Sequence, residues 1–206
     1  NVGILISGRG SNMVALLEAI RGGLVPARAA LVLSNEPEAA GLDKARSFGV
    51  PTRVLSHREF KGQGREAYDR ALAAALDEAG VDIVCLAGFM RVLGAWFTAR
   101  YEGRIINVHP ALLPSFPGLE AQRQTWEYGA KVSGCTVHIV DEEYDHGPIV
   151  VQAAVPVAMC HSSSGPQRTW TWTARAEAVP VTVTIPPRLA PAAGAVIETA
   201  GGGRAV

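Results

Sequence analysis

Two polar side chains able to stabilise a negative charge stand at the end of an apolar run near the middle of the chain. The β-branched residues of 105–108 predict the end of a buried strand, which delivers Asn107 and His109 into a proline-rich loop. Residues two apart on a strand point to the same side. An amide and an imidazole held side by side can stabilise a developing oxyanion. A capped strand end with a structural histidine is the alternative interpretation.

Alternating strands and helices are predicted around this pair. Continuous apolar runs are typical of strands buried on both faces, and glycines or turn residues separate them from segments with helical spacing. The predicted strands cover 2–7, 29–34, 51–55, 83–88, a segment ending near 109, 131–140 and 149–157, and the predicted helices cover 13–20, 39–48, 65–79 and 119–129. Within the sixth strand, Ser133 and Gly134 indicate a bulge or a close backbone approach. The pattern predicts an α/β fold with a doubly wound, mostly parallel sheet.

A glycine-rich turn between the first strand and the first helix predicts an anion site. Residues 8–12 read Gly-Arg-Gly-Ser-Asn, and the open amides and dipole of the following helix favour negative charge. The turn lacks the Gly-Lys-Ser/Thr of a P-loop, and Met13 stands where the third glycine of a dinucleotide motif would fall. A small phosphate ligand is therefore favoured, and an ordinary strand–helix turn is the alternative.

Three loops are expected to converge on one edge of the sheet. Ligands of doubly wound sheets bind beyond the carboxyl ends of the strands, where 8–12, 88–93 and 107–118 all begin. The acidic turn 141–148 follows the sixth strand. His109, His138, Asp145 and His146 show no recognised metal-ligand spacing, so we predict no metal site among them.

Composition limits the function classes that remain. The 206 residues have a net charge of zero and contain three cysteines. This balance lacks the basic excess typical of proteins that bind nucleic acid or membrane surfaces. The cysteines are too few for a disulfide framework. No apolar run approaches the ~20 residues that cross a bilayer, and we predict a cytoplasmic protein.

Four motifs in fixed order resemble the glycinamide ribonucleotide formyltransferase family of folate-dependent enzymes. They are ISGRGSN (6–12), AGFMRVL (87–93), INVHPALLPSFPG (106–118) and SGCTVHIVDEEYDHGPIVVQ (133–152). The resemblance covers about residues 2–157 and implies a Rossmann-like formyltransferase fold. It implies transfer of a formyl group from the co-substrate 10-formyltetrahydrofolate to the amine of glycinamide ribonucleotide, by a monomer or homodimer and without a metal.

The resemblance also implies roles for individual residues. The catalytic group corresponds to Asn107, His109 and Asp145, with His138 either supporting them or serving the structure alone. The turn at Gly10, Ser11 and Asn12 corresponds to the binding site for the ribonucleotide phosphate. The positions that correspond to the folate site are Arg65, near the glutamate tail, and Met90, Arg91, Val92, Leu93, Asn107, Val140 and Asp141.

The chain departs from the family pattern after residue 157. The family continues with a long helix that bears a Glu-His pair and supplies a glutamate to the substrate amine. Residues 158–206 instead contain no Lys or Asp, and prolines interrupt anything longer than a short strand. We therefore predict a catalytic domain over 1–157 and an atypical Pro/Gly/Ala-rich tail over 158–206. A shifted reading frame or a replaced C-terminus would explain the change, and a lineage-specific extension is the alternative.

Several other functions stay open on the sequence. A methionyl-tRNA formyltransferase would need a further nucleic-acid-binding domain, which the length and neutral charge disfavour. A formyltetrahydrofolate hydrolase would carry a regulatory domain before the first strand. A sugar-nucleotide formyltransferase is a weaker alternative. From another class, an altered tail could leave a catalytically impaired folate- or nucleotide-binding protein.

Overall fold

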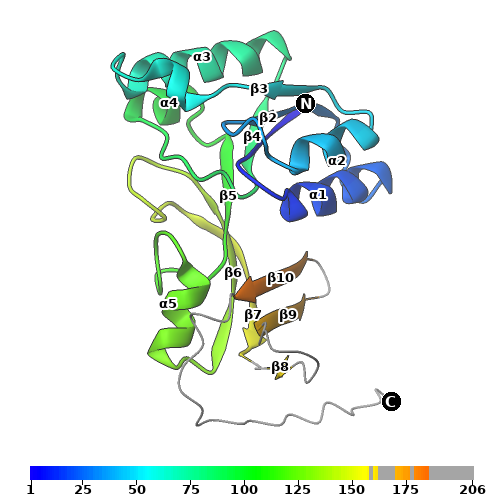
Figure 1. Cartoon of the computed structure of the whole chain (residues 1–206), viewed down its shortest axis with the longest axis vertical. Helices are drawn as coiled ribbons and strands as arrows, with labels where there is room; N and C mark the ends of the chain where they lie inside the picture. Colours follow the sequence, from blue (N-terminus) through cyan, green and yellow to red (C-terminus); the bar gives the residue numbers. More distant parts are fainter. Residues whose placement is uncertain (158–159, 162–169, 177–178, 186–206) are drawn as a thin grey trace.

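The chain folds around one large sheet with helices on both faces (Figure 1). The computed structural model describes the backbone of residues 1–157, 160–161, 170–176 and 179–185, and the side chains of residues 1–157. The strands of the large sheet are β1 (Val2–Ile6), β2 (Ala29–Ser34), β3 (Thr52–Val54), β4 (Ile83–Leu86), β5 (Ile105–His109), β6 (Val132–Ile139) and β7 (Ile149–Pro156). The helices are α1 (Ser11–Arg21), α2 (Gly41–Ser47), the short 3-10 helix η1 (His57–Phe60), α3 (Arg65–Glu78), α4 (Ala95–Arg100) and α5 (Ala121–Tyr128).

The strand order confirms the doubly wound, mostly parallel sheet. The order is β3-β2-β1-β4-β5-β6-β7, so the chain reverses direction across the sheet after β3. The first five strands in this order pair in parallel, whereas β6 and β7 pair antiparallel. The reversal point lies between β1 and β4, and ligands of such sheets bind beyond the strand ends at this point.

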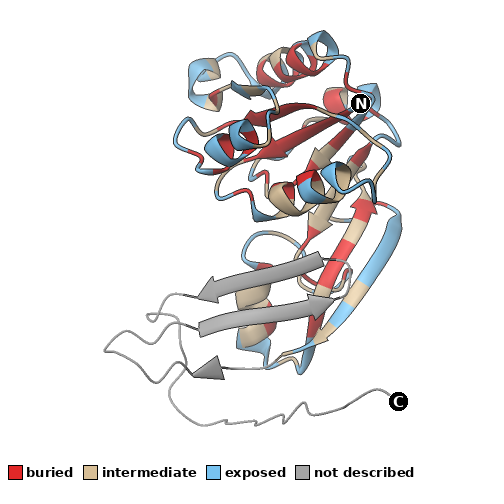
Figure 2. Cartoon of the chain, turned by 90° about the vertical axis from the view of Figure 1, so that its right-hand side faces the viewer, coloured by how far each residue is buried: buried red, intermediate tan, exposed pale blue. Residues whose placement is uncertain are grey.

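Two hydrophobic cores lie on the two faces of the sheet because side chains of β1 alternate between them. Leu5 packs with Leu72 of α3 and Phe97 of α4. Ile4 and Ile6 pack on the other face with residues of α1 and α2, including Met13. All five β1 residues are buried, as the unbroken apolar run predicted, and Figure 2 shows the buried strands between the helices. This rigid centre fixes the positions of the loops at its carboxyl edge.

The structure refines the sequence-based elements in two places. Helix α4 was not predicted, since its six residues are too few to show a helical period. In β6 the register shifts between Val137 and His138, so the bulge predicted at 133–134 is wrong in position. The alternative reading of Gly134, a close backbone approach, is confirmed: a Cβ there would overlap the carbonyl oxygen of Ala153 and lie 2.8 Å from the Leu112 side chain.

Gly134→Ala should therefore destabilise the fold. Forcing a methyl group between β6 and β7 costs about 1–3 kcal/mol of unfolding free energy, which corresponds to a melting temperature lower by roughly 2–10 °C. Thermal unfolding followed by circular dichroism measures the change. Gly8→Ala is the control, because a Cβ at Gly8 meets nothing within 4 Å. Equal melting temperatures for both variants would contradict the packing argument.

Beyond β7 the structure describes three strands of a separate sheet. These are β8 (Cys160–His161), β9 (Trp170–Ala176) and β10 (Val179–Ile185), in the order β10-β9-β8 with antiparallel pairing. Most of what the sequence suggested about 158–206 falls on residues outside the described ones. The division into a catalytic domain and an atypical tail therefore stays a prediction.

Candidate active site

Asn107, His109 and Asp145 lie together at the carboxyl end of β5. The first two residues come from β5, and Asp145 comes from the loop between β6 and β7. Nδ1 of His109 lies 3.3 Å from Oδ2 of Asp145, and Nδ2 of Asn107 donates to Oδ1 of Asp145 over 3.4 Å. The side chains of His109 and Asp145 are only 4% and 8% exposed. The carboxylate of Asp145, which the resemblance implied, therefore contacts both Asn107 and His109.

Asp145 stays ionised although it is buried. Burial alone would raise its pKa, but the His138 side chain, the Gly118 amide and the His109 imidazole favour the charged form, so the pKa of Asp145 lies below its usual value. The Gly118 N–H donates to Oδ2 over 2.8 Å. Asp145 also adopts a φ of +50°, which is uncommon for a non-glycine residue and typical of functional sites. The loop is therefore shaped to present a negative charge to β5.

His109 has a partner at each ring nitrogen. Nε2 lies 2.8 Å from the carbonyl oxygen of Phe116, and this oxygen can only accept, so Nε2 carries a proton. Nδ1 faces Asp145. His109 does not line the neighbouring cavity, so in this arrangement its contact with a substrate passes through Asp145.

His138 orients the Asn107 amide. Nδ1 of His138 lies 3.2 Å from the carbonyl oxygen of Ile139, which can only accept a hydrogen bond. Nε2 lies 3.1 Å from Nδ2 of Asn107. The side chain of His138 is 2% exposed and also lies 3.7 Å from Oδ1 of Asp145. The amide of Asn107 is therefore held with its N–H groups toward the carboxylate.

A cavity of about 70 Å³ adjoins this group of side chains. Most of the residues that the resemblance implied for a folate site line this cavity. Those lining it are Arg91, Val92, Leu93, Asn107, Val140 and Asp141, together with Asp145. Arg65 and Met90, which the resemblance placed with them, line two neighbouring cavities instead. We call the cavity of about 70 Å³ the central pocket.

The glycine-rich turn forms a second cavity at the start of α1. This cavity of about 220 Å³ is lined by Gly10, Ser11 and Asn12 and bordered by Met90, and we call it the phosphate pocket after the ligand that the sequence predicts. The first turn of α1 contains no acidic residue and no side chain caps it. The helix dipole and open amides therefore favour an anion here.

Gly10→Ala should weaken binding in the phosphate pocket. Gly10 has a φ of +68°, and a Cβ would lie 3.0 Å from Cα of Gly41, so alanine forces the turn to shift. Conformational strain of about 1–2 kcal/mol would raise the KM for a phosphorylated substrate roughly five- to thirtyfold. Steady-state kinetics with the second substrate saturating would measure this. Gly23→Ala, with a similar φ of +75° at the far end of α1, tests for strain alone, and an equal rise in KM would contradict the assignment.

Sequence reasoning missed the groups that hold these loops in place. Ser7 accepts from the Met90 N–H over 2.7 Å and donates to Oδ1 of Asn35 over 2.5 Å. Thr136 accepts from the Leu113 N–H over 2.9 Å and so ties the proline-rich loop to β6. Ser7 and Asn35 both follow buried strands, and this position in the sequence could have indicated that they lie at the site. The contributions of Phe116 and Gly118 come from the backbone, which has no sequence signature.

The described side chains offer no metal centre. Among residues 1–157, no three or more His, Cys, Asp or Glu side chains are arranged to hold a metal ion. Nδ1 of His146 lies 3.1 Å from Oδ2 of Asp141. No helix in the described part of the chain is long and apolar enough to cross a membrane.

Comparison with known proteins identifies the family. The family model described as formyl transferase matches residues 1–172. The chain belongs to the formyl transferase family. This formyl transferase is 44% identical over 157 residues to phosphoribosylglycinamide formyltransferase of Escherichia coli (strain K12), a match that covers 76% of the chain and 73% of that protein.

A longer protein and a solved structure are also similar to this chain. It is 51% identical over 158 residues to the trifunctional purine biosynthetic protein adenosine-3 of Drosophila melanogaster, of which the match covers only 12%. The crystal structure of glycinamide ribonucleotide transformylase 1 from Symbiobacterium toebii matches with a TM-score of 0.73 and 49% identity, covering 76% of this chain and 73% of that one. The family match over residues 1–172 includes the whole large sheet and the loops at its carboxyl edge.

Proposed function

We propose that this formyl transferase moves a formyl group from 10-formyltetrahydrofolate to the amine of glycinamide ribonucleotide. The observation that carries the proposal is the meeting of two pockets at one loop. Met90 borders the phosphate pocket, and Arg91 to Leu93 line the central pocket beside Asn107 and Asp145. Relatives that match over 73% of their length are named for this activity. The protein would act in the cytoplasm as a monomer or homodimer.

The two pockets suit the two reactants. The phosphate of the ribonucleotide would bind the open amides at Gly10, Ser11 and Asn12. The folate ring would enter the central pocket, where the apolar side chains of Val92, Leu93 and Val140 accompany the Arg91 and Asp141 groups. Met90 and Arg65, from the neighbouring cavities, would border the bound co-substrate. The amine and the formyl group would then meet near Asn107.

The chemistry needs an oxyanion donor and a proton carrier. Attack of the amine nitrogen on the formyl carbon forms a C–N bond and places negative charge on the formyl oxygen. An N–H of Asn107 would stabilise this oxygen by replacing its long 3.4 Å bond to Asp145. Breaking the bond from the formyl carbon to the folate nitrogen completes the transfer.

Asp145 would transfer a proton between the two reactants, and His109 would support it. The attacking amine loses one proton, and the departing folate nitrogen gains one. Asp145 lines the central pocket and can accept from the amine, directly or through one water, and return the proton to the leaving nitrogen. The buried His109 imidazole, facing Asp145 at 3.3 Å, stabilises the carboxylate between these steps. No covalent enzyme intermediate is required.

An assay with both reactants tests the function. The purified protein is incubated with 10-formyltetrahydrofolate, with and without glycinamide ribonucleotide, and the release of tetrahydrofolate is followed. Release that depends on the amine and yields the formylated ribonucleotide supports the proposal. Release without the amine would identify a hydrolase, and folate binding without release would identify an impaired binding protein. Either of these results would overturn the proposal.

A further inference from the structure

The turn 116–119, which precedes α5, contacts the catalytic group through backbone groups. The carbonyl oxygen of Phe116 lies 2.8 Å from Nε2 of His109, and the N–H of Gly118 donates to Oδ2 of Asp145 over 2.8 Å. The first contact decides where His109 carries a proton. The second is one of the interactions that keep the pKa of Asp145 below its usual value. The orientation of this turn therefore bears on the protonation of both side chains.

The turn has a strained backbone. Phe116 has a φ of +54°, and Glu120, just beyond the turn, has a φ of +56°. Residues with a side chain rarely adopt this left-handed region, and they persist in it only where surrounding contacts fix them. Gly118 also has a positive φ, of +86°, but a glycine adopts this value without strain. Contacts from outside the turn must therefore hold it in this shape.

Gln124 of α5 supplies two of these contacts. Its Nε2 donates to the carbonyl oxygen of Pro117 over 3.0 Å and to that of Leu119 over 2.9 Å. The two carbonyls flank Gly118, so one side-chain amide uses both of its N–H donors on this turn. The backbone N–H of Gln124 donates to the carbonyl oxygen of Glu120 over 3.0 Å, and this bond fixes the base of the side chain in the first turn of α5.

One peptide group joins Gln124 to Asp145. The carbonyl of Pro117 and the N–H of Gly118 belong to the same planar unit. The carbonyl accepts from Gln124, and the N–H donates to Asp145. Because the two groups of a trans peptide point in opposite directions, a carbonyl fixed toward Gln124 turns the N–H toward Asp145. A hydrogen bond to the carbonyl also polarises the peptide and strengthens the bond that its N–H donates.

Other side chains hold the earlier part of the same loop. Oγ1 of Thr136 accepts from the N–H of Leu113 over 2.9 Å, and Nε2 of Gln152 donates to the carbonyl oxygen of Leu113 over 2.8 Å. Both contacts are made three residues before the turn. The two ends of the loop are thus anchored separately, and loss of the Gln124 amide would release the end that faces the catalytic group.

We propose that Gln124 is a positioning residue for formyl transfer. Its amide holds the turn 116–119 so that Asp145 and His109 keep their contacts with the backbone of the turn. The inference rests on the proposed function, in which Asp145 carries the proton. Gln124 is not among the residues that line the central pocket, so its effect reaches the reactants through the turn. It should therefore act on the chemical step more than on the binding of either reactant.

Kinetics of substituted proteins test this inference. Gln124→Met keeps the length of the side chain but removes both donors, and kcat should fall about five- to fiftyfold, since each net hydrogen bond contributes up to about tenfold. The KM for each reactant should change less than about threefold. Gln122→Met, two residues earlier on α5, is the matched control and should change neither quantity. Gln124→Lys supplies N–H donors again and should recover most of the lost kcat.

Several results would overturn the inference. These are a fall in kcat that Gln122→Met shares, a loss confined to KM, and a Gln124→Lys protein no more active than Gln124→Met. A lower melting temperature with a natural kcat would show that Gln124 serves the fold alone.

The pH dependence of kcat separates positioning from a purely structural role. Loss of the Gln124 amide weakens the hydrogen bond from the turn to Asp145, so the carboxylate is less stabilised and its pKa should rise. The other titratable groups that face Asp145 are unchanged: His109 from β5, His138 from β6 and the neighbouring Tyr144. As the pH falls, Gln124→Met should therefore lose activity at a higher pH than the natural protein. Coincident acid limbs would contradict the positioning role.

A measurement without reactants keeps this inference distinct from the proposed function. Carboxyl carbon NMR of the protein with isotope-labelled aspartate follows the titration of Asp145 directly. A higher pKa in Gln124→Met, but not in Gln122→Met, supports the positioning geometry, and an absence of formyl transfer by the natural protein would then refute the transferase alone. An unchanged pKa together with a natural kcat refutes the role of Gln124 and leaves the transferase standing.

Discussion

Asp145→Asn is expected to lower kcat for formyl transfer by about 10²- to 10⁴-fold, the usual contribution of a positioned proton carrier. The amide has nearly the same shape and still offers an oxygen to the Gly118 N–H, which now donates over 2.8 Å. It cannot accept a proton from the amine, and it removes the negative charge 3.3 Å from His109. The KM for each reactant should therefore change much less than kcat.

Single-turnover kinetics separate this chemical effect from binding. Glu102→Gln removes an exposed carboxylate far from the site and should leave kcat unchanged. Melting temperatures of both variants show whether the fold is kept. A kcat for Asp145→Asn within twofold of the natural value would remove Asp145 from the proton path.

Asn107→Ala is expected to lower kcat/KM by about 10²- to 10³-fold, as loss of one oxyanion donor typically does. The change removes the N–H groups that now face His138 at 3.1 Å and Asp145 at 3.4 Å. It also removes the contact that Nε2 of the buried His138 makes with Asn107. The loss should therefore appear in the chemical step and, to a smaller degree, in stability.

A second substitution at the same position sharpens this test. Asn107→Asp keeps the volume but replaces the donor with a charged acceptor beside Asp145, so it should be at least as damaging as Asn107→Ala. Gln122→Ala, which removes an amide from α5, is the control for loss of an amide group. An active Asn107→Asp variant would show that Asn107 acts through its shape rather than through its N–H groups.

The sequence predicted well those parts whose signal is an apolar period. The run 29–34 became β2 without a change of bounds, and the helix expected over 65–79 became α3 over Arg65–Glu78. Asn107 and His109 lie together at a strand end, as the strand period required. That Asp145 lies close to them was predicted from the resemblance alone. No local sequence pattern predicts where the tip of a hairpin loop will lie.

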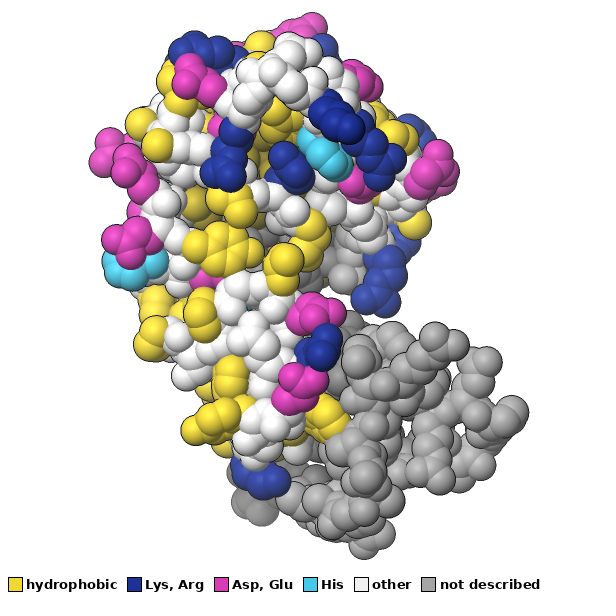
Figure 3. All heavy atoms as spheres, turned by 60° about the vertical axis from the view of Figure 1, so that its left-hand side comes forward, with side chains coloured by type: hydrophobic (Ala, Val, Ile, Leu, Met, Phe, Trp, Pro, Cys, Tyr) yellow, Lys and Arg dark blue, Asp and Glu magenta, His cyan; other side chains and the backbone are white. Residues whose placement is uncertain are grey.

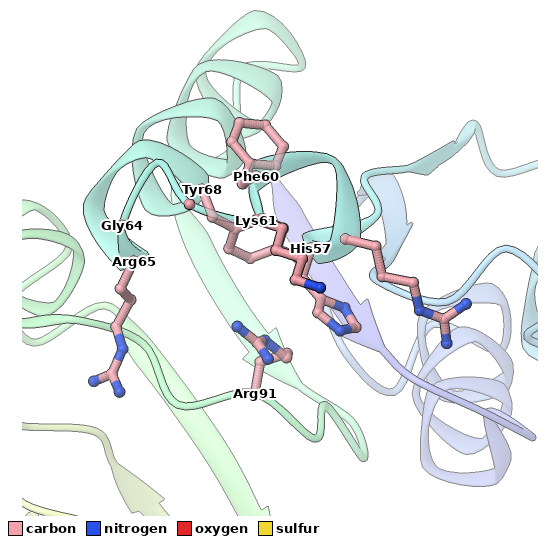
Figure 4. A pocket seen from close by; sticks show the side chains of 9 residues that line it. His57, Phe60, Lys61, Gly64, Arg65, Tyr68 and Arg91 are labelled. Carbon is pink, nitrogen blue, oxygen red and sulfur yellow. The ribbon is translucent and has the colours of Figure 1, made fainter.

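The other features of the fold and the site could not be predicted from the sequence, because they depend on backbone atoms and on packing. The Phe116 carbonyl that occupies Nε2 of His109 would be present with any residue at that position. The bulge at Val137–His138 arises where β6 turns His138 toward Asn107, while the more conspicuous Ser133-Gly134 pair marks the close contact with β7 instead. A cavity of about 400 Å³ likewise joins two segments, η1 and the Arg91 loop, that the sequence keeps about thirty residues apart. Figure 3 shows Lys, Arg and His side chains gathered around this hollow, and Figure 4 shows the cavity from close by.

Four consecutive residues after β4 serve three different cavities. Met90 borders the phosphate pocket, Arg91 lines both the central pocket and the cavity of about 400 Å³ beside η1, and Val92 and Leu93 line the central pocket. Substitution of one of these residues alters only the part of the cavity lining that this residue forms. A one-residue deletion or insertion would instead move every following side chain into its neighbour's place. During divergence of such enzymes, this segment should therefore accept changes of residue type far more readily than changes of length.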